Sequence, residues 1–175
     1  MRPQRRAWNA AHQLLQESGV RSAPVPVEKI AGKHAAIARE PLGDDISGML
    51  IPTKDGPVIV VNSDHSPARQ RFTLAHELGH LLLHNYTTPH ADRRYKVRFR
   101  NAASSEGRDV EEVEANQFAA ALLMPQDLLV KKLLEIGFEY DSNEDDSEQL
   151  AAVASAFKVS QQALSIRLSA LQLFW

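Results

Sequence analysis

The sequence predicts an α+β domain: a small, mostly antiparallel sheet of three strands packed with two long helices, followed by C-terminal helices of helix-turn-helix type. Three observations favour this fold class. Three short segments with the composition of strands occur before residue 63. A helical segment that carries the pattern His76-Glu77-Leu78-Gly79-His80 follows them directly. After it, the segments 109–124 and 150–175 have the composition and spacing of helices.

The composition is that of an ordinary globular protein. The chain has 175 residues, of which 43% are hydrophobic and 24% charged, and its formal net charge of −2 does not favour nucleic acid or an anionic membrane as a partner. No apolar run approaches the roughly 20 residues that span a bilayer, and no apolar signal core follows the basic N-terminus. We therefore expect a cytoplasmic protein. Cysteine is absent, so any metal must be held by histidines and carboxylates.

The N-terminal elements follow from spacing and from proline. Residues 4–18 are predicted to form a helix, because their apolar residues recur at helical spacing and Gly19 provides a stop signal. Prolines make residues 22–26 an extended link. A short second helix is predicted over residues 27–31.

Three strands are predicted next, over residues 35–40, 47–51 and 57–62. The last strand contains four consecutive β-branched residues, Val58 to Val61, as expected of a buried strand. Asp55-Gly56 before it is a hairpin turn signal. Ser63 or Asp64 is then expected to cap the following helix or a turn that precedes it.

The following helix, about residues 66–84, carries the most informative pattern in the chain. His76 and His80 are four residues apart, so both imidazoles project from one face and can share a cation, usually Zn²⁺. Glu77 lies about 100° around the helix from His76, beside the metal, where a carboxylate can take a proton from water. Leucines gather on the opposite face and are expected to pack inward.

A zinc site needs a third protein ligand, and the helix predicted over about 109–124 offers three glutamates. We expect Glu114 to be the ligand, because it lies in the middle of an apolar face and a buried carboxylate needs a cation. Glu111, at the edge of that face, ranks second, and Glu112, which points away, ranks third. The alternative for Glu114 is a buried salt bridge with an arginine.

The remaining histidines are not expected to bind the metal. His84 follows His80 by four residues, but a straight helix places it about 12 Å from His76. The three imidazoles cannot all reach one ion, so we expect His84 to be an outer contact of the site or a helix-end residue. Four further histidines fit no ligand spacing: His12, His34, His65 and His90.

Residues 85–108 have little periodicity and include a basic run from Arg93 to Arg100. This segment either borders a substrate groove or forms an edge strand in which Tyr95, Val97 and Phe99 alternate with basic residues. The two alternatives are compatible.

The C-terminal part is predicted to be helical. After Pro125, a helix is expected over residues 126–136, and the acidic residues 139–148 are expected to be solvated. From residue 150 onward two helices are predicted, with Ser160 as the N-cap of the second. We accordingly divide the chain into a main domain, an acidic linker and C-terminal helices that pack on the same domain, over residues 1–137, 138–149 and 150–175.

Two blocks of sequence are specific enough to carry a family resemblance. They run from Arg69 to His84 and from Glu112 to Pro125, and they contain the motifs HELGH and EANQFAAALLMP. In these blocks the chain resembles the ImmA/IrrE family of bacterial and phage metallopeptidases. Three further segments also fit that family, so that the resemblance covers most of residues 10–171: Ile46–Leu50, Val58–Asn62 and Phe157–Leu168.

The resemblance implies a gluzincin-like minimal metallopeptidase, in which His76, His80 and Glu114 bind the metal and Glu77 is the general base. We expect Zn²⁺ as the cofactor, with Mn²⁺ as the alternative. The resemblance also implies a helix-turn-helix repressor protein, of XRE type, as the substrate or partner. Its cleavage would release mobile-element, phage or stress genes.

The expected reaction is therefore hydrolysis of a peptide bond by a zinc-dependent endopeptidase. The metal makes its bound water more acidic, and Glu77 accepts the proton and then delivers it to the leaving amine. Candidates for a second electrophile all lie in the irregular segment: Tyr86, His90, Tyr95 and Arg98.

Two rival functions come from other classes of protein. Residues 150–171 have the spacing of a helix-turn-helix, as in a DNA-binding regulator. Their second helix offers only Arg167 as a cation, however, whereas a DNA reader needs several, so we expect no direct binding of nucleic acid. The other rival is a toxin–antitoxin-like module that sequesters a repressor without cutting it. Glu77 argues against this module, because a purely structural metal site has no use for a base. The oligomeric state stays open.

Overall fold

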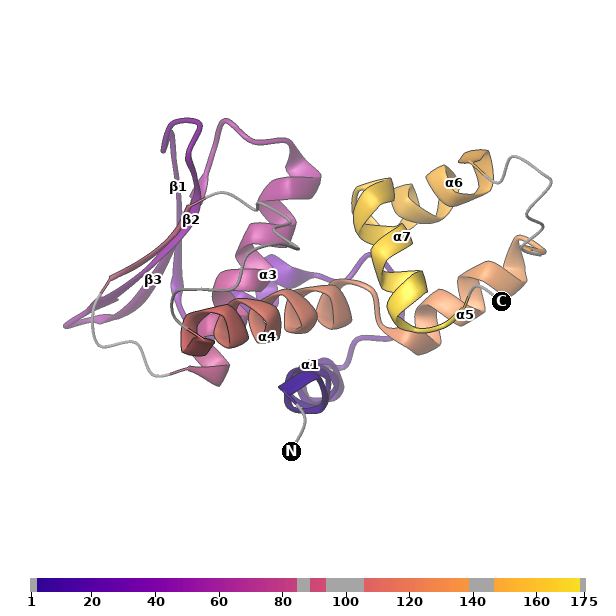
Figure 1. Ribbon diagram of the computed structural model, residues 1–175, viewed down its shortest axis with the longest axis horizontal. Coiled ribbons are helices and arrows are strands. Elements are labelled where there is room, and N and C mark those ends of the chain that lie inside the picture. The colour runs from indigo at the N-terminus through magenta and orange to yellow at the C-terminus, as the bar shows by residue number, and fades with distance from the viewer. Residues whose placement is uncertain (1–2, 85–88, 94–105, 139–146, 174–175) are drawn as a thin grey trace.

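A computed structural model describes residues 3–84, 89–93, 106–138 and 147–173 (Figure 1). In these ranges the fold is α+β, with four strands in one mixed sheet and seven helices. The elements follow one another as α1 (Pro3–Glu17), α2 (Val27–Ala31), β1 (Ala36–Glu40), β2 (Ile46–Thr53), β3 (Gly56–Asn62), α3 (Pro67–Leu83), β4 (His90–Arg93), α4 (Glu106–Leu123), α5 (Gln126–Glu135), α6 (Ser147–Phe157) and α7 (Gln161–Ala170).

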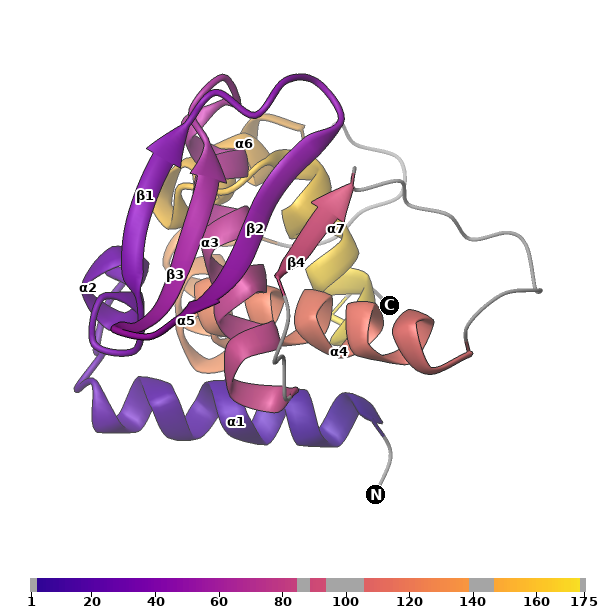
Figure 2. The same cartoon turned by 90° about the vertical axis from the view of Figure 1, so that its left-hand side faces the viewer.

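The sheet differs from the expected one in strand number and in strand direction. Its order is β1-β3-β2-β4, with β1 parallel to β3 and the other two pairs antiparallel (Figure 2). The prediction of three strands was therefore wrong and did not include the parallel β1–β3 pair, whereas the other two pairs agree with a mostly antiparallel sheet. The fourth strand is a four-residue edge strand, His90–Arg93, with no β-branched residue to signal it. Nothing local in β1 indicates that its neighbour is β3 rather than the next strand along the chain.

The helix that carries the His-Glu pattern begins near residue 66, as predicted, and Ser63 and Asp64 lie in the turn before it. Ser66, rather than Ser63 or Asp64, is the N-cap of α3, and its hydroxyl accepts a hydrogen bond of 3.4 Å from the Arg69 amide. Pro67 occupies the first turn, where its missing N–H costs no helical hydrogen bond. The helix then runs to Leu83 and crosses the face formed by β2 and β3.

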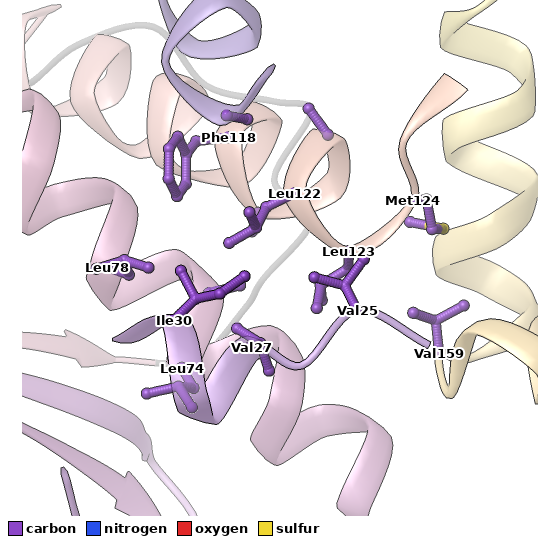
Figure 3. Close-up of a cluster of buried hydrophobic side chains, with 14 of the residues drawn as sticks. Val25, Val27, Ile30, Leu74, Leu78, Phe118, Leu122, Leu123, Met124 and Val159 are labelled. Carbon is purple, nitrogen blue, oxygen red and sulfur yellow. The ribbon is translucent and has the colours of Figure 1, made fainter. Parts of the chain in front are cut away.

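The hydrophobic core joins helices from both ends of the chain. Helix α4 packs against both α3 and α1, and α3 lies between α4 and the sheet (Figures 1 and 2). At the α3–α4 contact a Cβ added to Gly79 would lie 3.0 Å from Phe118 Cδ1, so the absence of a side chain lets the two helices approach closely. Figure 3 shows residues of this core from four segments: Val25, Val27, Ile30, Leu74, Leu78, Phe118, Leu122, Leu123, Met124 and Val159.

The C-terminal helices share this core. Phe157 of α6 and Leu164 and Leu168 of α7 are fully buried in the same cluster. Ser160 is the N-cap of α7, as predicted, and accepts a hydrogen bond of 3.1 Å from the Ala163 amide. Helices α5, α6 and α7 lie at the end of the molecule opposite the sheet (Figure 1). None of the helices in the described ranges has both the length and the apolar character needed to cross a bilayer.

Candidate metal centre

Helix α3 places its two patterned histidines side by side in the interior. His76 and His80 have no exposed surface, and their Nε2 atoms are 2.9 Å apart. Their rings meet edge to face, with centroids 4.5 Å apart. This arrangement follows from the spacing of four residues, which brings both imidazoles to one face of the helix.

Helix α4 adds Glu112 to these histidines. Its two carboxylate oxygens lie 3.4 Å from His76 Nε2 and 3.3 Å from His80 Nε2. Among the described residues, His76, His80 and Glu112 form a group whose ligand atoms all lie within 4.8 Å of one another. Zinc bonds of 2.0–2.1 Å in a tetrahedron require ligand atoms separated by about 3.3 Å. The two imidazoles and the carboxylate therefore fit a divalent cation.

Glu114, expected to be the third ligand, is not brought to this group. Its carboxylate is buried, as predicted, but Oε2 lies 3.0 Å from His84 Nε2 and 3.5 Å from Arg6 Nη1. The contact with Arg6 resembles the alternative considered for Glu114, a buried salt bridge with an arginine. The physical reason is that α4 is covered by α1 as well as by α3, and residues two apart on a helix point about 200° from each other. Burial alone could not distinguish the two covered sides. Glu111 is not part of the group either.

Glu77 is buried on the same turn as His76, next to strand β2. It has no exposed surface, and a Cβ added to Gly48 of β2 would stand 3.2 Å from its Oε1 atom. The same Cβ would lie 2.5 Å from Thr73 Cγ2. Only a residue without a side chain therefore lets β2 pass so close to the expected base.

Each of the two histidines also has a partner on its outer nitrogen. His76 Nδ1 is 3.2 Å from the side-chain oxygen of Asn116 on α4. His80 Nδ1 is 3.1 Å from Nδ1 of His84, which is the C-cap of α3. His84 is thus an outer contact at the helix end, as its spacing predicted. Such outer contacts fix which ring nitrogen carries the hydrogen. Asn116 was missed because the sequence does not show which residues of α4 face α3.

His90 of β4 also lies at this centre. Its Nε2 atom is 3.3 Å from Glu112 Oε1, and its ring centroid is 4.6 Å from that of His80. The sequence analysis proposed His90 as a candidate electrophile and found no metal-ligand spacing for it. Its position at the centre results from the pairing of β4 with β2. The other candidates, Tyr86, Tyr95 and Arg98, and the alternating residues Val97 and Phe99, lie outside the described residues.

The electrostatics of the group suit a cation. Burial lowers the pKa of His80 to about 4, so its imidazole is neutral near pH 7. Burial alone would raise the pKa of Glu112, but hydrogen bonds with His76, His80 and His90 outweigh it and lower that pKa well below its ordinary value. The hydrogen bond with Glu112 raises the pKa of His90. A neutral imidazole and an ionised carboxylate are the forms that bind a metal.

Comparison with known proteins gives three kinds of relative. A family model described as the IrrE N-terminal-like domain, peptidase family M78, matches residues 19–169. The radiation response metalloprotease IrrE of Deinococcus radiodurans is 35% identical over 111 residues, which make up 59% of this chain and 32% of that protein. Immunity region protein 2 of Bacillus phage phi105 is 36% identical over 100 residues, or 57% of this chain and 58% of that protein.

A solved structure of a Mycobacterium tuberculosis transcriptional regulator has the same fold, with a TM-score of 0.61 and 16% sequence identity. The match covers 94% of this chain and 46% of the regulator. The chain thus spans less than two thirds of the length of each of these three proteins.

Proposed function

Because the chain belongs to the ImmA/IrrE family, whose IrrE N-terminal-like domain defines peptidase family M78, we propose that it is a zinc-dependent endopeptidase. Its substrate would be a helix-turn-helix repressor of XRE type, whose cleavage relieves repression of mobile-element, phage or stress genes. The observation that carries the proposal is the group of His76, His80 and Glu112 with Glu77 buried on the same turn of α3. Family membership by itself identifies a metallopeptidase domain.

The proposed metal ligands are His76 and His80 from α3 and Glu112 from α4. Two imidazoles and one carboxylate at tetrahedral spacing suit zinc and leave one position open, which distinguishes a catalytic site from a structural one. Manganese prefers more oxygen ligands and is therefore the second cation to compare. When bound, such a cation supplies a Lewis acid that polarises a carbonyl and makes water more acidic.

Glu77 is the proposed general base. Its carboxylate accepts a proton as water attacks the carbonyl carbon of the scissile bond, and it delivers that proton to the leaving amine as the C–N bond breaks. Of the expected electrophiles, His90 is the one supported by position. The hydrogen bond with Glu112 raises the pKa of His90, which favours the protonated, positively charged ring, and such a ring can donate to the carbonyl oxygen as negative charge develops there.

The repressor as substrate is supported more indirectly. One relative is named as a radiation response metalloprotease and another as an immunity region protein of a phage. Strand β4, which contains His90, is the edge strand of the sheet in the described part of the chain, where an extended segment of a substrate would add as a further strand.

A cleavage assay tests the proposal. The full chain, loaded with Zn²⁺, is incubated with the helix-turn-helix repressor encoded beside it, and fragments are identified by mass. Glu77→Gln should retain the metal and lose cleavage by at least about 100-fold, the lower end for a general base. The exposed substitution Glu135→Gln is the matched control and should cut normally.

The two rival functions predict other outcomes. If wild type and Glu77→Gln both bind the repressor and neither cuts it, the protein is a sequestering module. A DNA-binding role is disfavoured by Arg167, the one cation of α7, because that side chain is buried. Its Nε donates a hydrogen bond of 3.2 Å to the Met124 carbonyl, and its guanidinium lies 5.2 Å from the Trp8 ring centroid. It is therefore not presented to a phosphate backbone.

A further inference from the structure

A chain of polar contacts leads from His80 to the N-terminal helix. His80 Nδ1 lies 3.1 Å from His84 Nδ1, and His84 Nε2 lies 3.0 Å from Glu114 Oε2. The same oxygen of Glu114 is 3.5 Å from Arg6 Nη1 on α1. We propose that His84, Glu114 and Arg6, hereafter the relay, hold His80 in the tautomer that binds metal and thereby set the affinity of the centre. The inference rests on the metal centre proposed above.

The hydrogens in the relay follow from the chemistry of its ends. An ionised Glu114 can only accept, so Nε2 of His84 must carry a hydrogen. A neutral His84 then has no hydrogen on Nδ1, which becomes the acceptor for Nδ1–H of His80. When a cation occupies the centre, His80 would then present to it the lone pair on Nε2, the atom that lies beside Glu112 and His76 and that hydrogen-bonds to Glu112 without the cation. The negative charge of Glu114 therefore acts through His84 to orient a lone pair of His80 toward the metal position.

Burial makes these contacts necessary rather than incidental. The side chains of His84 and Glu114 are 5% and 6% exposed, so each would lose free energy if it had no polar partner in the interior. Arg6 supplies the positive charge for the buried carboxylate and also donates a hydrogen bond to the Leu83 carbonyl at the end of α3. Arg6 is half exposed, so we expect its effect to be smaller than that of Glu114.

The two metal histidines are therefore supported differently. His76 faces an uncharged amide oxygen of Asn116, whereas His80 is connected through His84 to a carboxylate. Arg6 lies outside residues 19–169, the range matched by the family model, so the family match does not include its contact. Through this contact α1 becomes part of the metal centre.

Zinc affinity is the first test, measured on the full chain by competition with a chromogenic chelator. Loss of an outer contact typically weakens metal binding about 10–100-fold, and we expect Glu114→Gln to fall in this range. Arg6→Met should have a smaller effect, and Arg6→Lys, which retains a cation, should recover part of it. Arg5→Met, on the exposed side of the same helix, is the matched control and should leave affinity unchanged. In a Glu114→Gln background, Arg6→Met should add no further loss, because Arg6 acts through Glu114.

The second test observes the tautomers directly in the zinc-loaded protein. Long-range ¹H–¹⁵N spectra should show the hydrogen of His80 on Nδ1 and that of His84 on Nε2. In Glu114→Gln the amide can donate as well as accept, so both tautomers of the His84 ring should be populated. A merely structural role for Glu114 would not move these signals.

The results separate this inference from the proposed function. Unchanged zinc affinity in a folded Glu114→Gln variant, or unchanged tautomers, overturns the relay. Zinc binding that responds to Glu114→Gln in a chain that cuts no repressor supports the relay while removing the proposed substrate. If the wild-type chain binds no zinc, the relay fails together with the metal centre on which it rests.

Discussion

Two glutamates that lie two positions apart on α4 have opposite surroundings. Glu112 faces the imidazoles of His76, His80 and His90, whereas Glu114 faces His84 and the guanidinium of Arg6. Side-chain nitrogens lie next to both carboxylates. Among the described residues, however, only Glu112 and its neighbours His76 and His80 place their ligand atoms at the spacing of a tetrahedral metal site. Their substitution therefore has different consequences for the metal.

We predict that Glu112→Gln removes zinc binding, while Glu114→Gln only weakens it. A direct ligand contributes more than the about 10–100-fold attributed to an outer contact, because its loss also leaves the cation under-coordinated. Equilibrium dialysis with metal analysis measures both variants, with Glu135→Gln as the exposed control. A greater loss in Glu114→Gln than in Glu112→Gln would contradict the ligand set and restore the assignment made from the sequence.

At this scale the sequence brought His76, Glu77 and His80 together, but it did not show that Glu112 rather than Glu114 lies beside the two histidines. His76, Glu77 and His80 lie on one helix, so their relative positions follow from their spacing in the sequence. Choosing between Glu112 and Glu114 requires knowing which neighbour covers each side of α4, and α1 and α3 cover it from different directions. A helical wheel reports burial but not the identity of the covering residue.

Among the elements, strand β2 and helix α3 make the closest approach near the site. Gly48 of β2 lies where a Cβ would stand 2.5 Å from Thr73 Cγ2, 3.0 Å from the Val60 carbonyl oxygen and 3.2 Å from Glu77 Oε1. A methyl group at this position must push the strand and the helix apart. The strand also has an irregular register between Ile46 and Gly48, next to β4.

Substitution of Gly48 by alanine is therefore expected to lower the free energy of unfolding by about 1–3 kcal/mol, the usual cost of overpacking. Most of the conflict is with one methyl group, so Thr73→Ser should recover part of this loss. A double-mutant cycle by urea denaturation measures the coupling, which should be favourable by more than about 0.5 kcal/mol. Strictly additive effects of the two substitutions would show that the strand relaxes without contacting Thr73.

The elements themselves were largely predictable, whereas their pairing was not. The α3 and α4 helices, the β2–β3 hairpin and the Ser160 cap follow from local periodicity and turn chemistry. The parallel β1–β3 pair and the edge strand β4 depend on contacts between distant parts of the chain. His90 was accordingly named without a position, since only β4 brings it to the metal centre.

Over the whole molecule, the C-terminal helices are connected to the N-terminal helix. Arg167 of α7 lies over the Trp8 ring of α1 and donates to the carbonyl of Met124 at the end of α4. Burial lowers the pKa of Arg167 to about 10, still far above neutral pH, so its charge is retained. A charged group in the interior is tolerated because the carbonyl and the aromatic face stabilise it. The helices α1, α4 and α7 should therefore unfold together.

We predict that Phe157→Ala destabilises the entire chain rather than its C-terminal helices alone. Phe157 is fully buried in the core that also contains residues of α1, α3 and α4, and truncation of a buried phenylalanine costs about 3–5 kcal/mol. Ile166→Ala, on a side chain that is 55% exposed, is the control and should change stability by less than about 0.5 kcal/mol.

Two probes decide whether this unfolding is a single transition. In a Trp175→Phe background, Trp8 is the one tryptophan left, so its fluorescence reports the docking of α7, while far-ultraviolet circular dichroism reports all helices. Both urea transitions should shift to the same lower midpoint in Phe157→Ala, as for one cooperative unit. A fluorescence transition that moves while the main helical transition stays in place would show that the C-terminal helices fold separately. In that case Arg167 would be released when they detach, and the objection to a DNA-binding role would no longer hold.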